Sequence, residues 1–220
     1  MNQIFHTLKL PDYVTLLNAL CGVTAILLIL NGFTYLAPLL ILVAAVADGL
    51  DGHIARKFSS SEIGGNLDSL ADVISFGVAP VIITYSFAEN RYILPALFLY
   101  FVCGILRLAR FNTMHQGKNS FSGLPITAGG IAISSYLLMG ERFFDVRIMT
   151  SIALILGILM ISNITYLKVR NQKILIPLTL IFAATIISYS IDISYTHIMA
   201  SLLSGLMMIY MVSPIIKKTT

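Results

Sequence analysis

The sequence predicts an all-α integral membrane protein, a polytopic helical bundle of about eight transmembrane helices. Three observations support this prediction: hydrophobic residues fill 57% of the 220 positions, charged residues fill only 11%, and the mean hydropathy is +0.89. A soluble domain of this length would carry about 25% charged residues. One bundle can hold the whole chain, so residues 1–220 are expected to form a single membrane domain.

Eight apolar stretches are each long enough to cross about 30 Å of hydrocarbon. They cover residues 13–31, 33–56, 64–88, 92–112, 121–140, 147–167, 173–190 and 194–213. Ahead of them, Ile4, Phe5 and Leu8 fall on one helical face before Pro11, which predicts that residues 1–12 lie on the membrane surface as an interfacial segment. The net charge of +4 is ordinary for a membrane protein with a basic cytoplasmic side, and no nucleic-acid partner is expected.

The basic residues predict the orientation of the chain. With a cytoplasmic N-terminus, eight spans place eleven of the 14 Lys and Arg residues on the cytoplasmic side. The three on the far side are Arg91, Arg142 and Arg147. This asymmetry agrees with the positive-inside rule. It predicts a multi-pass cell-membrane protein with both termini, and the acidic cluster described next, facing the cytoplasm.

Four of the ten acidic residues fall within 25 positions, and they are Asp48, Asp51, Asp68 and Asp72. Their spacings of three and four put both members of each pair on one helical face. Two helices joined by the short 57–63 connection would aim the four carboxylates at one another. A charge at mid-membrane costs on the order of 3 kcal/mol, so these acids require a shared cation. Carboxylate oxygens suit Mg²⁺, Mn²⁺ or Ca²⁺, and two such ions side by side serve phosphoryl transfer.

Three further residues fit a phosphate ligand beside these acids. Gly52 has no side chain and lets a ligand approach the backbone, while Gly64 opens the third span, where free amides favour an anion. Arg56 follows one turn after Gly52 and can pair with a phosphate. Two alternatives remain open: ion pairing of the acids with nearby arginines, and a cation-coupled transporter whose intramembrane acids mark an ion path.

These residues together resemble a known family signature. The pattern Asp48-x₂-Asp51-Gly52-x₂-Ala55-Arg56-x₇-Gly64-x₃-Asp68-x₃-Asp72 is similar to that of the CDP-alcohol phosphatidyltransferases. The resemblance implies an integral-membrane enzyme, usually a homodimer, that transfers a phosphatidyl group from a CDP-linked lipid to an alcohol and releases CMP. It implies two divalent ions, Mg²⁺ or Mn²⁺, on the four Asp residues, with Asp72 also the general base.

The resemblance also implies a set of CDP-binding residues. Gly52, Ala55, Arg56 and Gly64 would line the CDP site. Thr15 and Asn18, three apart on the first span, resemble the polar residues with which the family's first helix contacts the diphosphate. Helix capping and helix–helix hydrogen bonding are the alternative roles for these two side chains.

Three later stretches resemble the phosphatidylserine synthase branch of the family. They are Ser75-Phe-Gly-Val-Ala-Pro80, Arg107-Leu-Ala-Arg110-Phe-Asn112 and Phe121-Ser-Gly123-Leu-Pro125. The resemblance implies L-serine as the acceptor, with Arg107, Arg110 and Ser75 at its site, and an Arg fork suits the serine carboxylate. Anchoring at the membrane boundary is the alternative role for the two arginines.

The substrates are only partly defined by these motifs. Glycerol phosphate and inositol phosphate also need cations, so both remain open as acceptors. The donor lipid is CDP-diacylglycerol or CDP-archaeol, and Asp12-Tyr13 suggests the archaeal form. Pro80 is expected to kink the third span.

Overall fold

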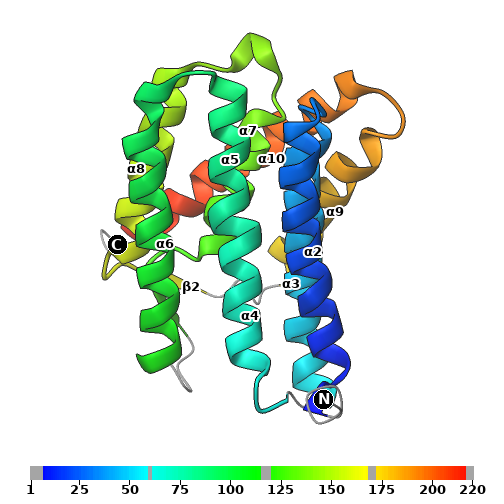
Figure 1. The fold of residues 1–220 in the computed structure, drawn as a ribbon, viewed down its shortest axis with the longest axis vertical. Helices are drawn as coiled ribbons and strands as arrows, with labels where there is room; N and C mark the ends of the chain where they lie inside the picture. Colours follow the sequence, from blue (N-terminus) through cyan, green and yellow to red (C-terminus); the bar gives the residue numbers. More distant parts are fainter. Residues whose placement is uncertain (1–6, 59–60, 115–119, 168–171, 217–220) are drawn as a thin grey trace.

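The computed structural model describes residues 7–58, 61–114, 120–167 and 172–216. Its long helices run roughly side by side along one axis, and α10 runs obliquely behind them (Figure 1). The elements in chain order are α2 (Leu10–Leu30), α3 (Leu36–Phe58), α4 (Gly64–Asp72), η1 (Val73–Val78), α5 (Ala79–Ala88), η2 (Arg91–Ile93), α6 (Leu94–Met114), β1 (Ser120–Ser122), α7 (Ile126–Leu137), η3 (Glu141–Phe143), α8 (Val146–Ile161), β2 (Thr165–Leu167), α9 (Gln172–Ser188) and α10 (Ile193–Ile216).

The predicted all-α membrane bundle is confirmed. Five described helical segments are long and apolar enough to cross a membrane: Leu10–Leu30, Leu36–Ala55, Gly64–Ala88, Arg91–Thr113 and Ile193–Pro214. Three shorter apolar helices, at Ile126–Leu137, Val146–Ile161 and Thr179–Ser188, match the remaining three predicted stretches in order. The chain is therefore a multi-pass membrane protein.

The first helix begins earlier than predicted. Pro11 was expected to end an interfacial segment, but α2 starts at Leu10 with Pro11 in its first turn. A proline is tolerated there because the first amides of a helix have no intrahelical partner. Asp12 completes this start, since its Oδ2 accepts a hydrogen bond from the Lys9 amide at 2.6 Å. Residues 1–6 of the predicted interfacial segment lie outside the described part of the chain.

The predicted stretches 121–140 and 147–167 contain shorter helices because their ends pair with each other. The strands β1 and β2 run antiparallel, with Ser120 opposite Leu167 and Ser122 opposite Thr165. Gly123 follows β1 with a φ of +82°, a conformation that favours glycine, and turns the chain toward α7. This two-stranded ladder joins the connection before α7 to the one after α8, which brings the start of α7 to the same end of the bundle as the end of α8.

The third predicted span forms one continuous rod of α4, η1 and α5 (Figure 1). Its middle section, Val73–Val78, is a π-helix rather than an α-helix. This wider turn lies directly before Pro80, the residue at which a kink was expected. The rod packs against α2 and, through η1, against α6 and α7, so its buried side chains lie at the centre of the bundle.

Candidate active site

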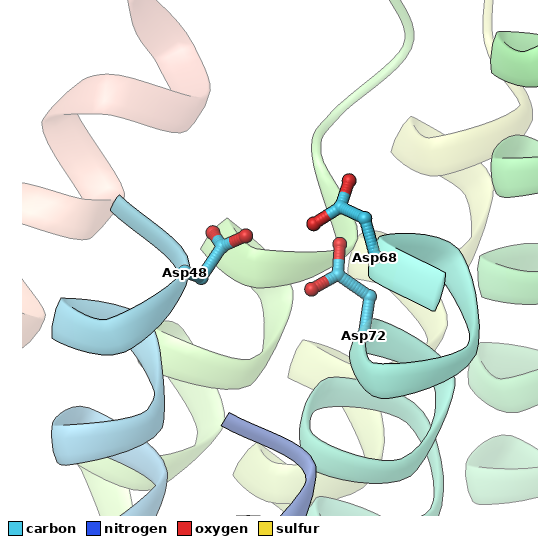
Figure 2. Close-up of side chains that lie close together, drawn as sticks. All are labelled: Asp48, Asp68 and Asp72. Carbon is cyan, nitrogen blue, oxygen red and sulfur yellow. The ribbon is translucent and has the colours of Figure 1, made fainter. Parts of the chain in front are cut away.

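Three acidic side chains converge at one end of the bundle. Asp48 extends from α3 and faces Asp68 and Asp72, which extend from successive turns of α4 (Figure 2). One carboxylate oxygen from each residue lies within 4.8 Å of the others. Asp72 is buried and the other two are half-buried. Like charges this close repel strongly unless a cation neutralises them, and carboxylate oxygens are the ligands that Mg²⁺ and Mn²⁺ prefer.

The first helix presents a polar stripe to this site. Thr15 and Asn18 are both buried on the face of α2 that packs against α3 and α4. The Thr15 hydroxyl donates to Oδ2 of Asp51 at 2.7 Å, and the Asn18 amide donates to Oδ1 of Asp72 at 3.3 Å. The other side-chain atom of Asn18, Oδ1, is buried without a hydrogen-bond partner among the described residues. The two predicted residues therefore contact the acidic cluster directly and leave one acceptor for a ligand.

Asp51 stands slightly apart from the other three acids. It is buried and bound by Thr15, and it is not part of the group whose oxygens lie within 4.8 Å in the described structure. It still interacts electrostatically with Asp48 and Asp68. The four predicted acids thus form a close triad and one neighbour.

Arg107 lies beside the triad. Its side chain is only 6% exposed, and its guanidinium lies 5.2 Å from the ring centre of Phe111. It interacts electrostatically with Asp72 and Asp48. This positive charge offsets part of the repulsion among the acids. Because one guanidinium carries less charge than three carboxylates, the site retains a net attraction for a cation.

The other two residues predicted for the serine site contact backbone carbonyls instead. The Arg110 guanidinium donates to the carbonyls of Ser122, Met160, Ile161 and Ser162, at 2.7 to 3.2 Å. It thereby caps the C-terminal end of α8 and holds β1. The Ser75 hydroxyl is fully buried and donates to the Asn18 carbonyl at 2.8 Å. Of these three residues, the structure thus places Arg107 in electrostatic interaction with the acids of the cluster, while the side chains of Arg110 and Ser75 bond to backbone carbonyls.

The remaining predicted residues lie on the two helices that carry the acids. Gly52 and Ala55 follow Asp51 on α3 and are half-buried, and Gly64 is the first residue of α4. The backbone of Arg56 belongs to α3, while the prediction for its side chain lies outside the described residues.

Two hydrogen bonds at or beside the site were not predicted from the sequence. Thr127, in the first turn of α7, donates to Oδ2 of Asp48 at 3.3 Å. The Ser61 hydroxyl donates to Oδ1 of Asp12 at 3.0 Å, which ties the α3–α4 connection to the start of α2. Asp12 does share a helical face with Thr15, and this spacing was a signal in the sequence. Thr127 and Ser61 gave none, since their partners lie 79 and 49 positions away.

The fold and the site together define a class: a polytopic helical membrane protein with a convergent, cation-attracting carboxylate cluster at one end of its bundle. The family model for CDP-alcohol phosphatidyltransferase matches residues 8–185. The chain therefore belongs to the CDP-alcohol phosphatidyltransferase family, as the signature from Asp48 to Asp72 predicted.

Similar proteins come from archaea and bacteria. The chain is 43% identical over 175 residues to the archaetidylserine synthase of Methanothermobacter thermautotrophicus, covering 77% of this chain and 74% of that protein. It is 38% identical over 173 residues to a CDP-diacylglycerol–serine O-phosphatidyltransferase of Methanocaldococcus jannaschii, covering 78% and 80%. A protein of the same name from Helicobacter pylori is 32% identical over 202 residues, covering 82% and 84%.

Proposed function

We propose that this protein transfers a phosphatidyl or archaetidyl group from a CDP-linked lipid to the hydroxyl of L-serine and releases CMP. The convergence of Asp48, Asp68 and Asp72 beside a buried Arg107 is the observation that carries the proposal. The serine acceptor is also supported by the names of the relatives described above. Family membership favours this reaction over cation-coupled transport.

The acidic cluster is assigned to two divalent ions, Mg²⁺ or Mn²⁺. Asp48, Asp68 and Asp72 would hold them, together with Asp51 on the side of α2. When bound, such ions neutralise phosphate oxygens and stabilise the leaving group. Thr15 and Asn18 orient the acids from α2, and Asn18 Oδ1 remains available as an acceptor.

The CDP group is assigned to the space between α2, α3 and the start of α4. Thr15 and Asn18 approach it from α2, and Gly52, Ala55 and Arg56 approach it from α3. Gly64 opens α4, and the positive end of the helix dipole there favours a diphosphate oxygen. The lipid tails then extend into the bilayer between helices.

Serine is assigned to the region between Asp72 and Arg107. The Arg107 guanidinium holds the serine carboxylate, and Asp72 accepts the proton of the serine hydroxyl. The serine oxygen attacks the β-phosphorus of the CDP-lipid and forms the new P–O bond. The bond from that phosphorus to the bridging oxygen breaks, and CMP leaves with this oxygen. Arg110 is assigned no contact with serine. Its role is to hold α8 and β1 in position beside the site.

The proposal extends to the arrangement of the protein in the cell membrane. Residues 1–220 form one membrane domain and assemble as a homodimer. Both termini and the acidic cluster face the cytoplasm, where serine and CMP are soluble. The asymmetric distribution of basic residues supports this orientation.

The test is CMP release by purified protein with Mn²⁺ or Mg²⁺. CDP-diacylglycerol and CDP-archaeol are supplied in separate reactions, each with serine, glycerol 3-phosphate or inositol phosphate. Release with serine alone supports the proposal. Release only with another acceptor refutes serine as the substrate, and no release with either donor refutes the transferase assignment.

A further inference from the structure

The π-helix that follows Asp72 has a missing backbone donor. In an α-helix, the carbonyl of residue 76 accepts the amide hydrogen of residue 80. Residue 80 is a proline and has no amide hydrogen. The Phe76 carbonyl therefore lacks its α-helical partner at the centre of the bundle, where Phe76 is fully buried. The observed ladder is in the π register, since the Ala79 amide donates to the Ile74 carbonyl. The missing residue-80 amide would serve the Ser75 carbonyl in that register and the Phe76 carbonyl in the α register, so this buried stretch is one backbone donor short, which is costly unless another group supplies it.

Tyr100, on α6, supplies this donor. Its hydroxyl donates to the Phe76 carbonyl at 2.6 Å, and its side chain is fully buried. The ring fits against α7 because Gly129 has no side chain: a Cβ there would lie 3.0 Å from the Tyr100 hydroxyl oxygen. The hydrogen bond between Tyr100 and Phe76 thus joins α6 to the rod at a tightly packed contact.

The position of this hydrogen bond relates it to the acids. Phe76 lies four residues after Asp72, or about 6 Å along the rod. A π-turn contains an extra residue, so the part of the rod before it is rotated relative to the part after it, by about 100° compared with an uninterrupted α-helix. Asp68 and Asp72 precede this turn, and α5 packs in the bundle after it. The turn therefore sets the direction in which both carboxylates point.

We infer that Tyr100 is a positioning residue for the acidic cluster: its hydroxyl replaces the amide that Pro80 lacks and keeps the π-turn that aims Asp68 and Asp72 at Asp48. The inference rests on the proposed metal-dependent function. It assigns Tyr100 no contact with substrate or metal. It does predict that removal of the Tyr100 hydroxyl changes metal binding, although Tyr100 lies 24 residues after its hydrogen-bond partner Phe76.

The test compares Tyr100→Phe with Tyr136→Phe in detergent-purified full-length protein. Tyr136 is a matched control because its hydroxyl also donates to a phenylalanine carbonyl, that of Phe143, at 2.9 Å. Mn²⁺ affinity is measured by electron paramagnetic resonance, and Tm by circular dichroism. Loss of a buried hydrogen bond should lower Tm in both variants. Only Tyr100→Phe should weaken Mn²⁺ binding, by about 3- to 10-fold.

Pro80→Ala provides a second, independent test. An alanine returns the missing amide, so Tyr100→Phe should weaken Mn²⁺ binding less in the Pro80→Ala background than in the natural one. If Tyr100→Phe does not fold alone, recovery of folding in the double variant supports the inference, and continued failure to fold overturns it.

Two outcomes are decisive against the inference. Unchanged Mn²⁺ affinity in Tyr100→Phe, or an equal loss in Tyr136→Phe, overturns it while leaving the proposed function intact. Absence of Mn²⁺ binding by the natural protein refutes the proposed metal site, and the inference with it.

Discussion

The side-chain amide of Asn18 donates a hydrogen bond to Oδ1 of Asp72, and this contact joins the first helix to the proposed general base. Asn18 is itself held, because its backbone carbonyl accepts the hydroxyl of Ser75 one turn beyond Asp72. Asp72 is therefore fixed on two sides, by α2 and by its own helix. Restrained in this way, Asp72 can direct Oδ2 toward the substrate while Oδ1 accepts the hydrogen bond from the Asn18 side-chain amide.

Asp72→Asn tests the base directly. The amide keeps the size of the side chain but accepts no proton, so CMP release should fall by about 10²- to 10⁴-fold. CDP-lipid binding, measured by isothermal titration calorimetry, should persist in part because the other acids remain. Asp192→Asn is the control, since Asp192 lies on the connection between α9 and α10 and its carboxylate accepts a local hydrogen bond from the Ser194 amide at 2.7 Å. Full turnover by Asp72→Asn would refute the assignment.

Substitutions of Arg107 and Arg110 by lysine should have different effects: the first on the KM for serine, the second on stability. Arg107→Lys keeps the charge but loses the bidentate fork, so the KM for serine should rise by about tenfold, while the KM for CDP-lipid changes little. Arg110→Lys should instead lower Tm, because a lysine cannot serve the four carbonyls at the ends of α8 and β1. If only Arg110→Lys raised the KM for serine, the assignment of the serine carboxylate to Arg107 would be wrong and Arg110 would be its partner.

The hydrogen bond from Thr15 to Asp51 should affect the metal requirement. Thr15→Val keeps the shape and removes the hydroxyl, leaving a buried carboxylate with one donor fewer. The Mn²⁺ concentration for half-maximal CMP release should rise by about 3- to 10-fold. Thr24→Val, on the same helix, removes an exposed hydroxyl that bonds only within α2 and should leave this concentration unchanged. Equal behaviour of the two variants would contradict a role for Thr15 at the site.

Gly123→Ala tests the turn that brings α7 to the site. Gly123 has a φ of +82°, and a Cβ there would lie 2.6 Å from Nη2 of Arg110 and would also collide with the Met160 carbonyl. Gly32→Ala is the matched control, because Gly32 has a φ of +84° but nothing within 4 Å of its Cβ position. The control should cost about 1–2 kcal/mol of stability from the backbone alone. Gly123→Ala should cost about 1–3 kcal/mol more, measured as a larger fall in Tm. Equal Tm values for the two variants would show that the collision is relieved.

The sequence predicted the features that depend on composition and on short spacings. Hydropathy located the eight apolar helices, and the spacing of Asp68 and Asp72 placed both on one side of α4. Thr15 and Asn18 were identified from the same kind of spacing, and the structure places both against the acids. Each of these features is decided within one helix, where neighbouring residues fix the geometry.

The features that the sequence did not predict depend on distant contacts. Strands of three residues are too short to show an alternating pattern, so the pairing of β1 with β2 appears only in three dimensions. The π-helix accepts a hydrogen bond at the Phe76 carbonyl from Tyr100, which lies on another helix. Arg110 has the residue type expected of a substrate ligand, but the end of α8 and the strand β1 place carbonyls around its guanidinium. Residue type indicates what a side chain can bind, while the fold decides which partner reaches it.

The short helix α7 has a consequence for how the protein is made. Its 12 residues extend about 18 Å, less than the roughly 30 Å of a bilayer core, and ten of them are buried. Such a segment has almost no surface to offer to lipid, and it is stabilised instead by α3, η1, α8 and α10. Because α10 follows α7 in the chain with α8 and α9 between them, α7 gains its full enclosure only after α10 has been made and packed. Thr127 reaches Asp48 from α7, so this contact at the candidate active site depends on a helix that is fully enclosed only once α10 has packed.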